Sequence, residues 1–187
     1  GHKGMVGSAI VNEFNSLNLE VLTVEKNELN LTDFSLVNDW FETNKPDIVI
    51  IAAAKVGGIY ANVSYPYEFL MDNMLIQNNL ISSSFELNVK KFIFLGSSCI
   101  YPKFANQPIK EEYLLTSSLE YTNEPYAIAK IAGIKMCENY NNQYKTDFIS
   151  LMPTNLYGYN DNFDLETSHV IPALMRKIHL AKCLEKN

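Results

Sequence analysis

A tyrosine and a lysine four residues apart are the first residues whose types and spacing could do chemistry. Tyr126 and Lys130 lie within residues 125–144, whose pattern predicts a helix, so their side chains should share one face. Because a nearby ammonium stabilises phenolate, we expect the pKa of Tyr126 to be lowered toward neutrality. Such a tyrosine can pass a proton to or from a carbonyl oxygen during hydride transfer. The same spacing is common on exposed helix faces, so the pair carries meaning only with partners.

Serines at the end of a predicted strand supply the third member of such a site. Residues 91–95 read as a buried strand that runs directly into Gly96, Ser97 and Ser98. Open α/β sheets bind their ligands at the carboxyl ends of parallel strands. We therefore expect Ser97 or Ser98 to hydrogen-bond a substrate oxygen beside Tyr126.

A glycine-rich turn opens the chain and suits the phosphates of a dinucleotide. Gly1, Gly4 and Gly7 have a G-x-x-G-x-x-G spacing, and residues 5–17 read as a helix. Glycine allows a tight turn and lets the backbone approach a pyrophosphate, which the free N–H groups of the helix N-terminus bind. Such a spacing can equally occur in an ordinary loop. The motif gains weight because the strand-end serines and the tyrosine–lysine pair follow it in the expected order.

The residues after the next predicted strand should set the choice of cofactor. Residues 21–24 read as that strand, and Glu25 and Lys26 follow it. In dinucleotide folds a carboxylate here binds the ribose diol of NAD, whereas a cation accommodates the 2′-phosphate of NADP. Glu25 would suit the diol, but Lys26 and Lys3 together would form a phosphate clamp, which favours NADP. The alternative is that both lysines are ordinary surface residues.

The remaining pattern alternates strands and helices, which is typical of a parallel α/β sheet. Further strands are predicted at residues 47–54 and 148–152, and further helices at residues 33–43, 66–87 and 170–184. The run at 47–54 is continuously apolar, as expected of a strand buried on both faces. The fold class is thus α/β, a Rossmann-type doubly wound parallel sheet. We expect it to lack its first strand, because the chain begins at the glycine turn, and to lack most of a C-terminal substrate domain.

Composition narrows the class of protein. The chain has 187 residues, 47% of them hydrophobic and 19% charged, which suits one globular domain with a core. Its net charge of -6 gives no support to binding of nucleic acid or of a membrane surface. Cys99, Cys137 and Cys183 are scattered and odd in number, so we expect a reducing compartment, the cytoplasm, and no zinc site.

Stretches spread over the whole chain resemble the extended short-chain dehydrogenase/reductase family. They are GHKGMVGSAI, AAAKVGGI, LGSSCIYPK, TNEPYAIAKIAGIK, MPTNLYG and SHVIPAL. The resemblance implies Ser97, Tyr126 and Lys130 as the catalytic trio of an NADP-dependent oxidoreductase. It also implies Cys99 and His169 as the acid/base pair of an epimerisation.

The resemblance further implies domains, contacts and an assembly. Residues 1–165 would be the NADP-binding domain and residues 166–187 the start of the substrate-binding region, with Lys177 near a GDP-sugar. In this family the helices corresponding to residues 66–87 and 125–144 pair between subunits, so a homodimer is expected. The expected NADP contacts are the glycine turn, the two lysines, the strand ends and the start of the last helix: Gly1, Lys3, Gly4, Met5, Val6, Gly7, Lys26, Leu95, Gly96, Ser97, Ser98, Lys130, Pro153, Thr154, Asn155, Leu156 and His169.

The implied reaction has two steps. GDP-4-keto-6-deoxy-D-mannose is epimerised at C3 and C5, and NADPH then reduces it at C4 to GDP-L-fucose. Protons beside the 4-keto group are acidic because the enolate oxygen can be stabilised. A thiol and an imidazole have pKa values near enough to neutral to remove one proton and return another, and we expect Cys99 to be the base. The alternative is an inactive fragment of such an enzyme.

Other functions fit part of the pattern. A nucleotide-sugar 4-epimerase retains NAD and does not need the thiol. A 4,6-dehydratase of this family typically carries an acidic pair after the strand-end hydroxyl residue, where this chain has Ser98 and Cys99. A non-catalytic dinucleotide-binding module would not need an intact serine, tyrosine and lysine set. A packing role for Cys99 and a structural role for His169 are the alternatives to their chemistry.

Overall fold

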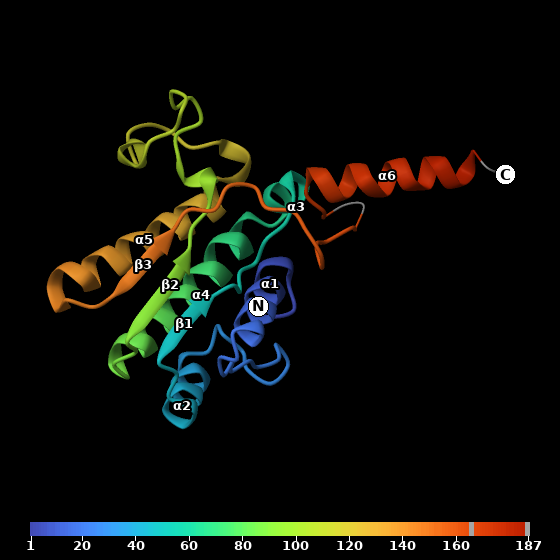
Figure 1. Cartoon of the computed structure of the whole chain (residues 1–187). Coiled ribbons are helices and arrows are strands. Elements are labelled where there is room, and N and C mark those ends of the chain that lie inside the picture. The colour runs from blue at the N-terminus through green and yellow to red at the C-terminus, as the bar shows by residue number, and fades with distance from the viewer. Residues whose placement is uncertain (165–166, 186–187) are drawn as a thin grey trace.

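Three parallel strands form the central sheet of the computed structural model, which describes residues 1–164 and 167–185 (Figure 1). In the order in which they pair, the strands are β1 (Ile48–Ile51), β2 (Lys91–Leu95) and β3 (Phe148–Leu151). The helices are α1 (Met5–Ser16), α2 (Phe34–Asn44), α3 (Ile59–Ser64), α4 (Pro66–Glu86), α5 (Glu124–Tyr144) and α6 (Val170–Leu184). Short 3-10 helices lie at Ser98–Ile100, Glu111–Tyr113 and Tyr121–Asn123.

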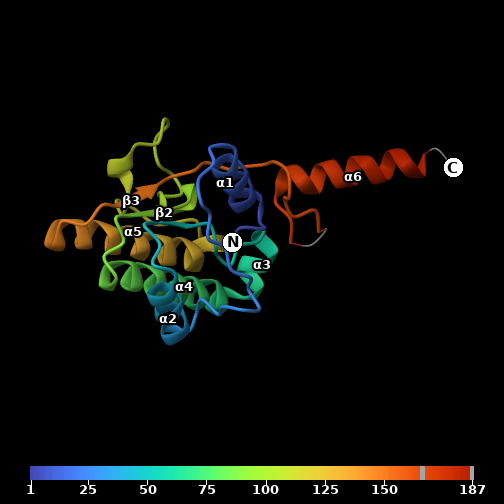
Figure 2. The ribbon, with the colours of Figure 1, turned by 60° about the horizontal axis from the view of Figure 1, so that its bottom comes forward.

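Helices lie on both sides of the sheet. α2, α4 and α5 lie together on one side, and α1 lies on the other (Figure 2). α4 packs along α5 and against α2, so these three helices form one continuous layer. A parallel sheet with helices on both sides is the layer arrangement of α/β folds, which confirms the predicted α/β fold class (Figure 2).

The core lies between β2 and the layer of α4 and α5. Phe92 and Phe94 are completely buried, whereas Ile93 between them points to the other side of the sheet and is only half-buried. The prediction that the apolar run at 47–54 is buried on both faces is wrong. In β1 only Ile51 is buried, and Ile48 is 54% exposed. The reason is that β1 pairs with β2 alone among the described strands, so it lies at the edge of the sheet.

Local signals fix the ends of the predicted helices. The Asp33 carboxylate accepts the N–H of Leu36 at 3.2 Å and so caps α2. Pro66 lies in the first turn of α4, where its missing N–H costs nothing. Lys145 closes α5 in the left-handed conformation, with a φ of 60°. The helices predicted from residues 33, 66, 125 and 170 are therefore confirmed, with ends that agree within one or two residues.

Two features of the fold differ from the sequence-based expectation. Residues 21–24 are not a strand, because a strand requires a paired neighbour and no described strand lies hydrogen-bonded beside them. The short helix α3 was not predicted, since six residues after Gly57 and Gly58 show too little periodicity. No helix within the described residues is long and apolar enough to cross a membrane.

Candidate functional site

Ser97, the serine expected at the end of β2, is followed directly by a 3-10 helix. Ser97 precedes this helix, and its Oγ accepts the N–H of Cys99 at 3.5 Å. The turn holds Cys99 half-buried just beyond the carboxyl end of the strand. The 3-10 helix packs against α5, the helix that carries Tyr126 and Lys130. The strand end and the helix therefore bring the predicted serine, cysteine, tyrosine and lysine to one place.

Lys130 is a buried cation at this place. Its side chain is 4% exposed, and Nζ donates a hydrogen bond to the carbonyl oxygen of Leu95 at 2.9 Å. Nζ also lies 4.7 Å from the ring centroid of Phe94 and 5.7 Å from that of Tyr126. Burial lowers the pKa of Lys130 to about 8, although a nearby Cys99 thiolate would raise it. Lys130 therefore remains mainly protonated at neutral pH, within reach of the tyrosine ring.

Tyr126 behaves differently from the sequence-based expectation. Burial raises the pKa of its phenol well above the ordinary value, and the negative charge of a Cys99 thiolate raises it further. The predicted lowering by Lys130 is wrong in this structure. The ammonium group of Lys130 is directed to the carbonyl oxygen of Leu95 and to the Phe94 ring. Tyr126 therefore holds its proton at neutral pH and can act as a proton donor.

The pKa of Cys99 depends on its burial and on its neighbours Ser97 and Lys130. Burial raises the pKa of its thiol, while the Ser97 hydroxyl and the charge of Lys130 act in the opposite direction. Burial has the larger effect, so Cys99 is a thiol rather than a thiolate at neutral pH. Removal of a proton from carbon by Cys99 therefore requires the thiol to give up its own proton first. The role of Cys99 as the base stays a prediction.

The glycine turn is packed as closely as its spacing predicted. A Cβ on Gly7 would collide with the carbonyl of Gly1, and a Cβ on Gly1 would collide with the backbone of Ala52, just after β1. Gly4 precedes α1 with its N–H bonded to the carbonyl of Gly1 at 3.1 Å. No side chain of the described residues caps α1, so its first-turn N–H groups are available to an anion. The turn and helix therefore fit the pyrophosphate of a dinucleotide.

A buried asparagine, which the sequence pattern did not single out, fixes the segment after β1. Asn73 of α4 accepts the backbone N–H of Lys55 at 2.9 Å and donates to its carbonyl oxygen at 3.0 Å. The Lys55 ammonium also pairs with Asp72 at 2.9 Å. Asn73 is 3% exposed, on the same side of α4 as the buried Phe69. An amide that interrupts the apolar side of a predicted helix is the signal that could have identified it.

The two lysines of the predicted phosphate clamp differ in their partners: Lys3 forms an ion pair, whereas Lys26 is exposed to solvent. Lys3 Nζ lies 2.6 Å from Oε1 of Glu25, and Nε2 of His2 lies 3.3 Å from the same oxygen. Together these groups hold the pKa of the Glu25 carboxyl below its usual range, Lys3 contributing most. Lys26 is exposed, and no carboxylate in the described part of the chain forms an ion pair with it. The structure thus ties Lys3 to Glu25 and leaves Lys26 open to solvent.

The segment that leaves β3 returns to α1. Pro153, Thr154 and Asn155 form its irregular beginning, and the amide of Asn160 donates to Oγ of Ser8 at 3.0 Å. Between this segment and α1 lies a hollow of about 550 Å³. Its lining includes three of the predicted cofactor contacts, namely Met5, Val6 and Leu156.

The sequence profile of the NAD dependent epimerase/dehydratase family matches residues 1–186. The chain belongs to this family. Relatives named GDP-L-fucose synthase, from Sinorhizobium fredii and Escherichia coli, are 57% and 55% identical to it, each over 97% of the chain. Among solved structures, a GDP-mannoheptose C4 reductase from Campylobacter jejuni with NADP bound is 45% identical, with a TM-score of 0.91 over 100% of the chain. The resemblance noted from the sequence motifs is therefore confirmed.

This family member spans little more than half of the proteins it resembles. It covers 58% of the Sinorhizobium fredii protein, 57% of the Escherichia coli protein and 55% of the Campylobacter jejuni chain. The matching part contains the glycine turn, the strand-end serine and the tyrosine–lysine pair.

The predicted residues of the last helix lie apart from the others. His169 is the exposed residue that precedes α6, and Lys177 is exposed farther along that helix, which projects from the body of the molecule (Figure 1). The preceding segment is anchored where the N–H of Gly58 donates to the carbonyl of Thr167 at 3.1 Å. Within the described residues, no hydrogen bond or ion pair joins His169 or Lys177 to the site residues Ser97, Cys99, Tyr126 and Lys130. Their roles stay predictions.

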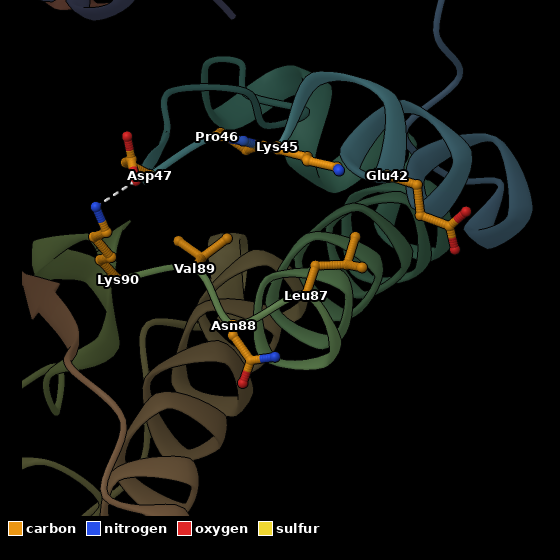
Figure 3. Close-up of a pocket in the computed structure, with 8 residues that line it drawn as sticks. All are labelled: Glu42, Lys45, Pro46, Asp47, Leu87, Asn88, Val89 and Lys90. Atoms are coloured by element: carbon orange, nitrogen blue, oxygen red, sulfur yellow. Dashed lines mark ion pairs between the residues drawn. The ribbon is translucent and has the colours of Figure 1, made fainter.

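A second hollow lies at the opposite end of the sheet. It has a volume of about 470 Å³, and Asp47 and Lys90, which directly precede β1 and β2, pair across it at 2.7 Å (Figure 3). Its other lining residues are Glu42, Lys45, Pro46, Leu87, Asn88 and Val89. Ligands of open α/β sheets bind at the carboxyl ends of the strands, so we assign this hollow no part in the family chemistry.

Proposed function

We propose that the complete protein epimerises GDP-4-keto-6-deoxy-D-mannose at C3 and C5 and reduces it at C4 with NADPH, giving GDP-L-fucose. The observation that carries the proposal is the meeting of Cys99, Tyr126 and Lys130 beyond the end of β2. A reductase needs the tyrosine and the lysine, whereas the cysteine beside them has a catalytic use when protons also move at carbon. Support comes from the two relatives named GDP-L-fucose synthase.

In the reduction step, Tyr126 donates the proton that the C4 oxygen requires. Its raised pKa keeps the phenol protonated at neutral pH, so the proton is available to a bound carbonyl oxygen. Ser97, at the end of β2, has a hydroxyl that can hold the same oxygen. NADPH, when bound, supplies the hydride to C4.

In the epimerisation step, one group removes a proton beside the 4-keto group and another returns a proton to the opposite side. Cys99 is the proposed base, acting after its thiol has given up its own proton, and His169 is the proposed acid that returns a proton. His169 stands at the N-terminus of α6 and reaches the sugar from a different element than Cys99 does. The Ser97 hydroxyl group stabilises the enolate oxygen between the two transfers.

The proposed cofactor is NADP, bound at the predicted residues. The free N–H groups at the start of α1 would hold its pyrophosphate, and the exposed Lys26 would meet its 2′-phosphate. Leu95 to Ser98 and the exit of β3 would lie along the nicotinamide half. The Campylobacter jejuni C4 reductase, whose structure contains NADP, supports this choice.

A simple C4 reductase is the second candidate. The Campylobacter jejuni relative is named as one, and Ser97, Tyr126 and Lys130 suffice for that chemistry. A 4-epimerase or a dehydratase fits less well, since Ser98 and Cys99 occupy the positions where dehydratases carry an acidic pair. Stereochemistry at C3 and C5 separates the two main candidates.

We also propose a homodimer in the cytoplasm. Leu75 on α4 and Ile128 on α5 are 39% and 45% exposed on two helices that pack against each other. An apolar surface over two adjacent helices favours pairing with a second copy. The free cysteines fit a reducing compartment.

The test is turnover of GDP-4-keto-6-deoxy-D-mannose by the complete protein with NADPH, followed by NMR of the product. We expect NADPH consumption and a sugar inverted at C3 and C5. A product that retains both configurations would replace the proposal with a C4 reductase. Absence of NADPH consumption by a protein that unfolds cooperatively would refute both candidates.

A further inference from the structure

Glu25 is linked to the glycine turn through two cationic or potentially cationic side chains. Its Oε1 lies 2.6 Å from Nζ of Lys3 and 3.3 Å from Nε2 of His2. Both partners come from the turn, 22 and 23 positions earlier in the sequence. The carboxylate is 39% exposed, so a ligand can reach it.

This ion pair opposes the clamp that the two lysines would otherwise form. A 2′-phosphate must attract Lys3 away from Glu25, and it must also approach a carboxylate of like charge. The 2′- and 3′-hydroxyl groups of an unphosphorylated dinucleotide meet no such obstacle. They donate hydrogen bonds to a carboxylate at this place, as in NAD-binding folds.

We propose that Glu25 is a specificity-determining residue that restrains Lys3 and accepts ribose hydroxyl groups, so that the protein uses NADH as well as NADPH. The inference rests on the proposed dinucleotide site and concerns its selectivity. Lys26 retains an attraction for the 2′-phosphate, and Glu25 offsets most of the contribution that Lys3 would add. Glu25 thus narrows the difference in affinity between the two cofactors.

The test compares the dissociation constants of NADPH and NADH for the complete protein and two variants. Glu25→Gln keeps the size of the side chain and removes the charge, and Glu20→Gln makes the same charge change at an exposed position. We expect Glu25→Gln to raise the preference for NADPH by about ten-fold or more, corresponding to about 1.4 kcal/mol, and Glu20→Gln to change it by less than about two-fold. Thermal unfolding confirms that each variant is folded.

A second variant tests the restraint on Lys3 directly. We expect Lys3→Gln to weaken NADPH binding by less than about three-fold in the wild-type background and by about ten-fold beside Glu25→Gln, because only there is the ammonium free. Equal losses in both backgrounds, or an unchanged cofactor preference in Glu25→Gln, would overturn the inference while leaving the proposed function intact. A wild-type protein that binds neither cofactor would overturn the proposed function and the inference with it.

Discussion

Asn73 gives the sharpest stability prediction, because one side chain holds a whole backbone segment. Its amide makes three hydrogen bonds, two with the backbone of Lys55 and one to the carbonyl of Phe69 at 2.7 Å. Asn73→Ala removes all three and leaves backbone groups without partners beside a 3% exposed position. With about 1 kcal/mol net for each hydrogen bond, we expect a loss of about 3 kcal/mol in the free energy of unfolding.

The assay is thermal or urea unfolding, with Asn139→Ala, at an exposed position of α5, as the matched control. A loss of about 3 kcal/mol corresponds to a fall of about 6–12 °C in Tm for a domain of this size. NADPH affinity should fall with it, since the segment that begins at Ala52 packs against the glycine turn. If Asn73→Ala is no less stable than Asn139→Ala, the hydrogen bonds of Asn73 do not hold this segment as argued.

Three further outcomes are expected. Folding lowers the pKa of Lys130 from 10.5 to about 8, so between these pH values the unfolded chain holds this proton more tightly than the folded protein does. The free energy of unfolding of the wild type should therefore rise by up to about 3 kcal/mol from pH 8 to pH 10.5. Urea unfolding at each pH should show this rise in the wild type but not in Lys130→Met. Gly7→Ala should lower the free energy of unfolding by about 1–3 kcal/mol, because the new Cβ would collide with the backbone of the turn. Gly4→Ala should lower it by less than about 1 kcal/mol, because its Cβ would lie 3.5 Å from the carbonyl oxygen of Gly1. Equal losses in thermal unfolding would contradict the packing argument. Sedimentation should show a dimer of the complete protein that Leu75→Asp or Ile128→Asp converts to monomer, and a wild-type monomer at micromolar concentration would refute the dimer.

The order and kind of the main elements could be predicted because their signals are local. Asp33 caps its helix through a residue three positions away, and Pro66 marks the start of α4 by its own geometry. The apolar run that forms β2 predicted that Ser97, which follows it, lies at the end of a strand. That placement predicted its proximity to the tyrosine and lysine of α5, since ligands gather at the carboxyl ends of parallel strands.

What could not be predicted depends on packing between distant segments. The pKa of Tyr126 follows from burial and from the direction in which the Lys130 ammonium is held, neither of which a four-residue spacing contains. Lys3 and Glu25, which pair in the structure, are 22 positions apart. From the sequence alone, each of them could be interpreted as a cofactor contact, and nothing showed that they contact each other. Residues 21–24 have the composition of a strand, but a strand also needs a neighbour with which to pair.

Solvent deuterium exchange tests the central claim most directly. The keto sugar is incubated in deuterated water with the complete protein but without NADPH, and deuterium at C3 and C5 is followed by NMR. Exchange should occur with the wild type, continue in Tyr126→Phe, which stops only reduction, and be lost in Cys99→Ser, because a serine hydroxyl is a far weaker acid than a thiol. Exchange at the wild-type rate in Cys99→Ser would show that Cys99 only packs, and it would contradict the assignment of epimerisation to this site.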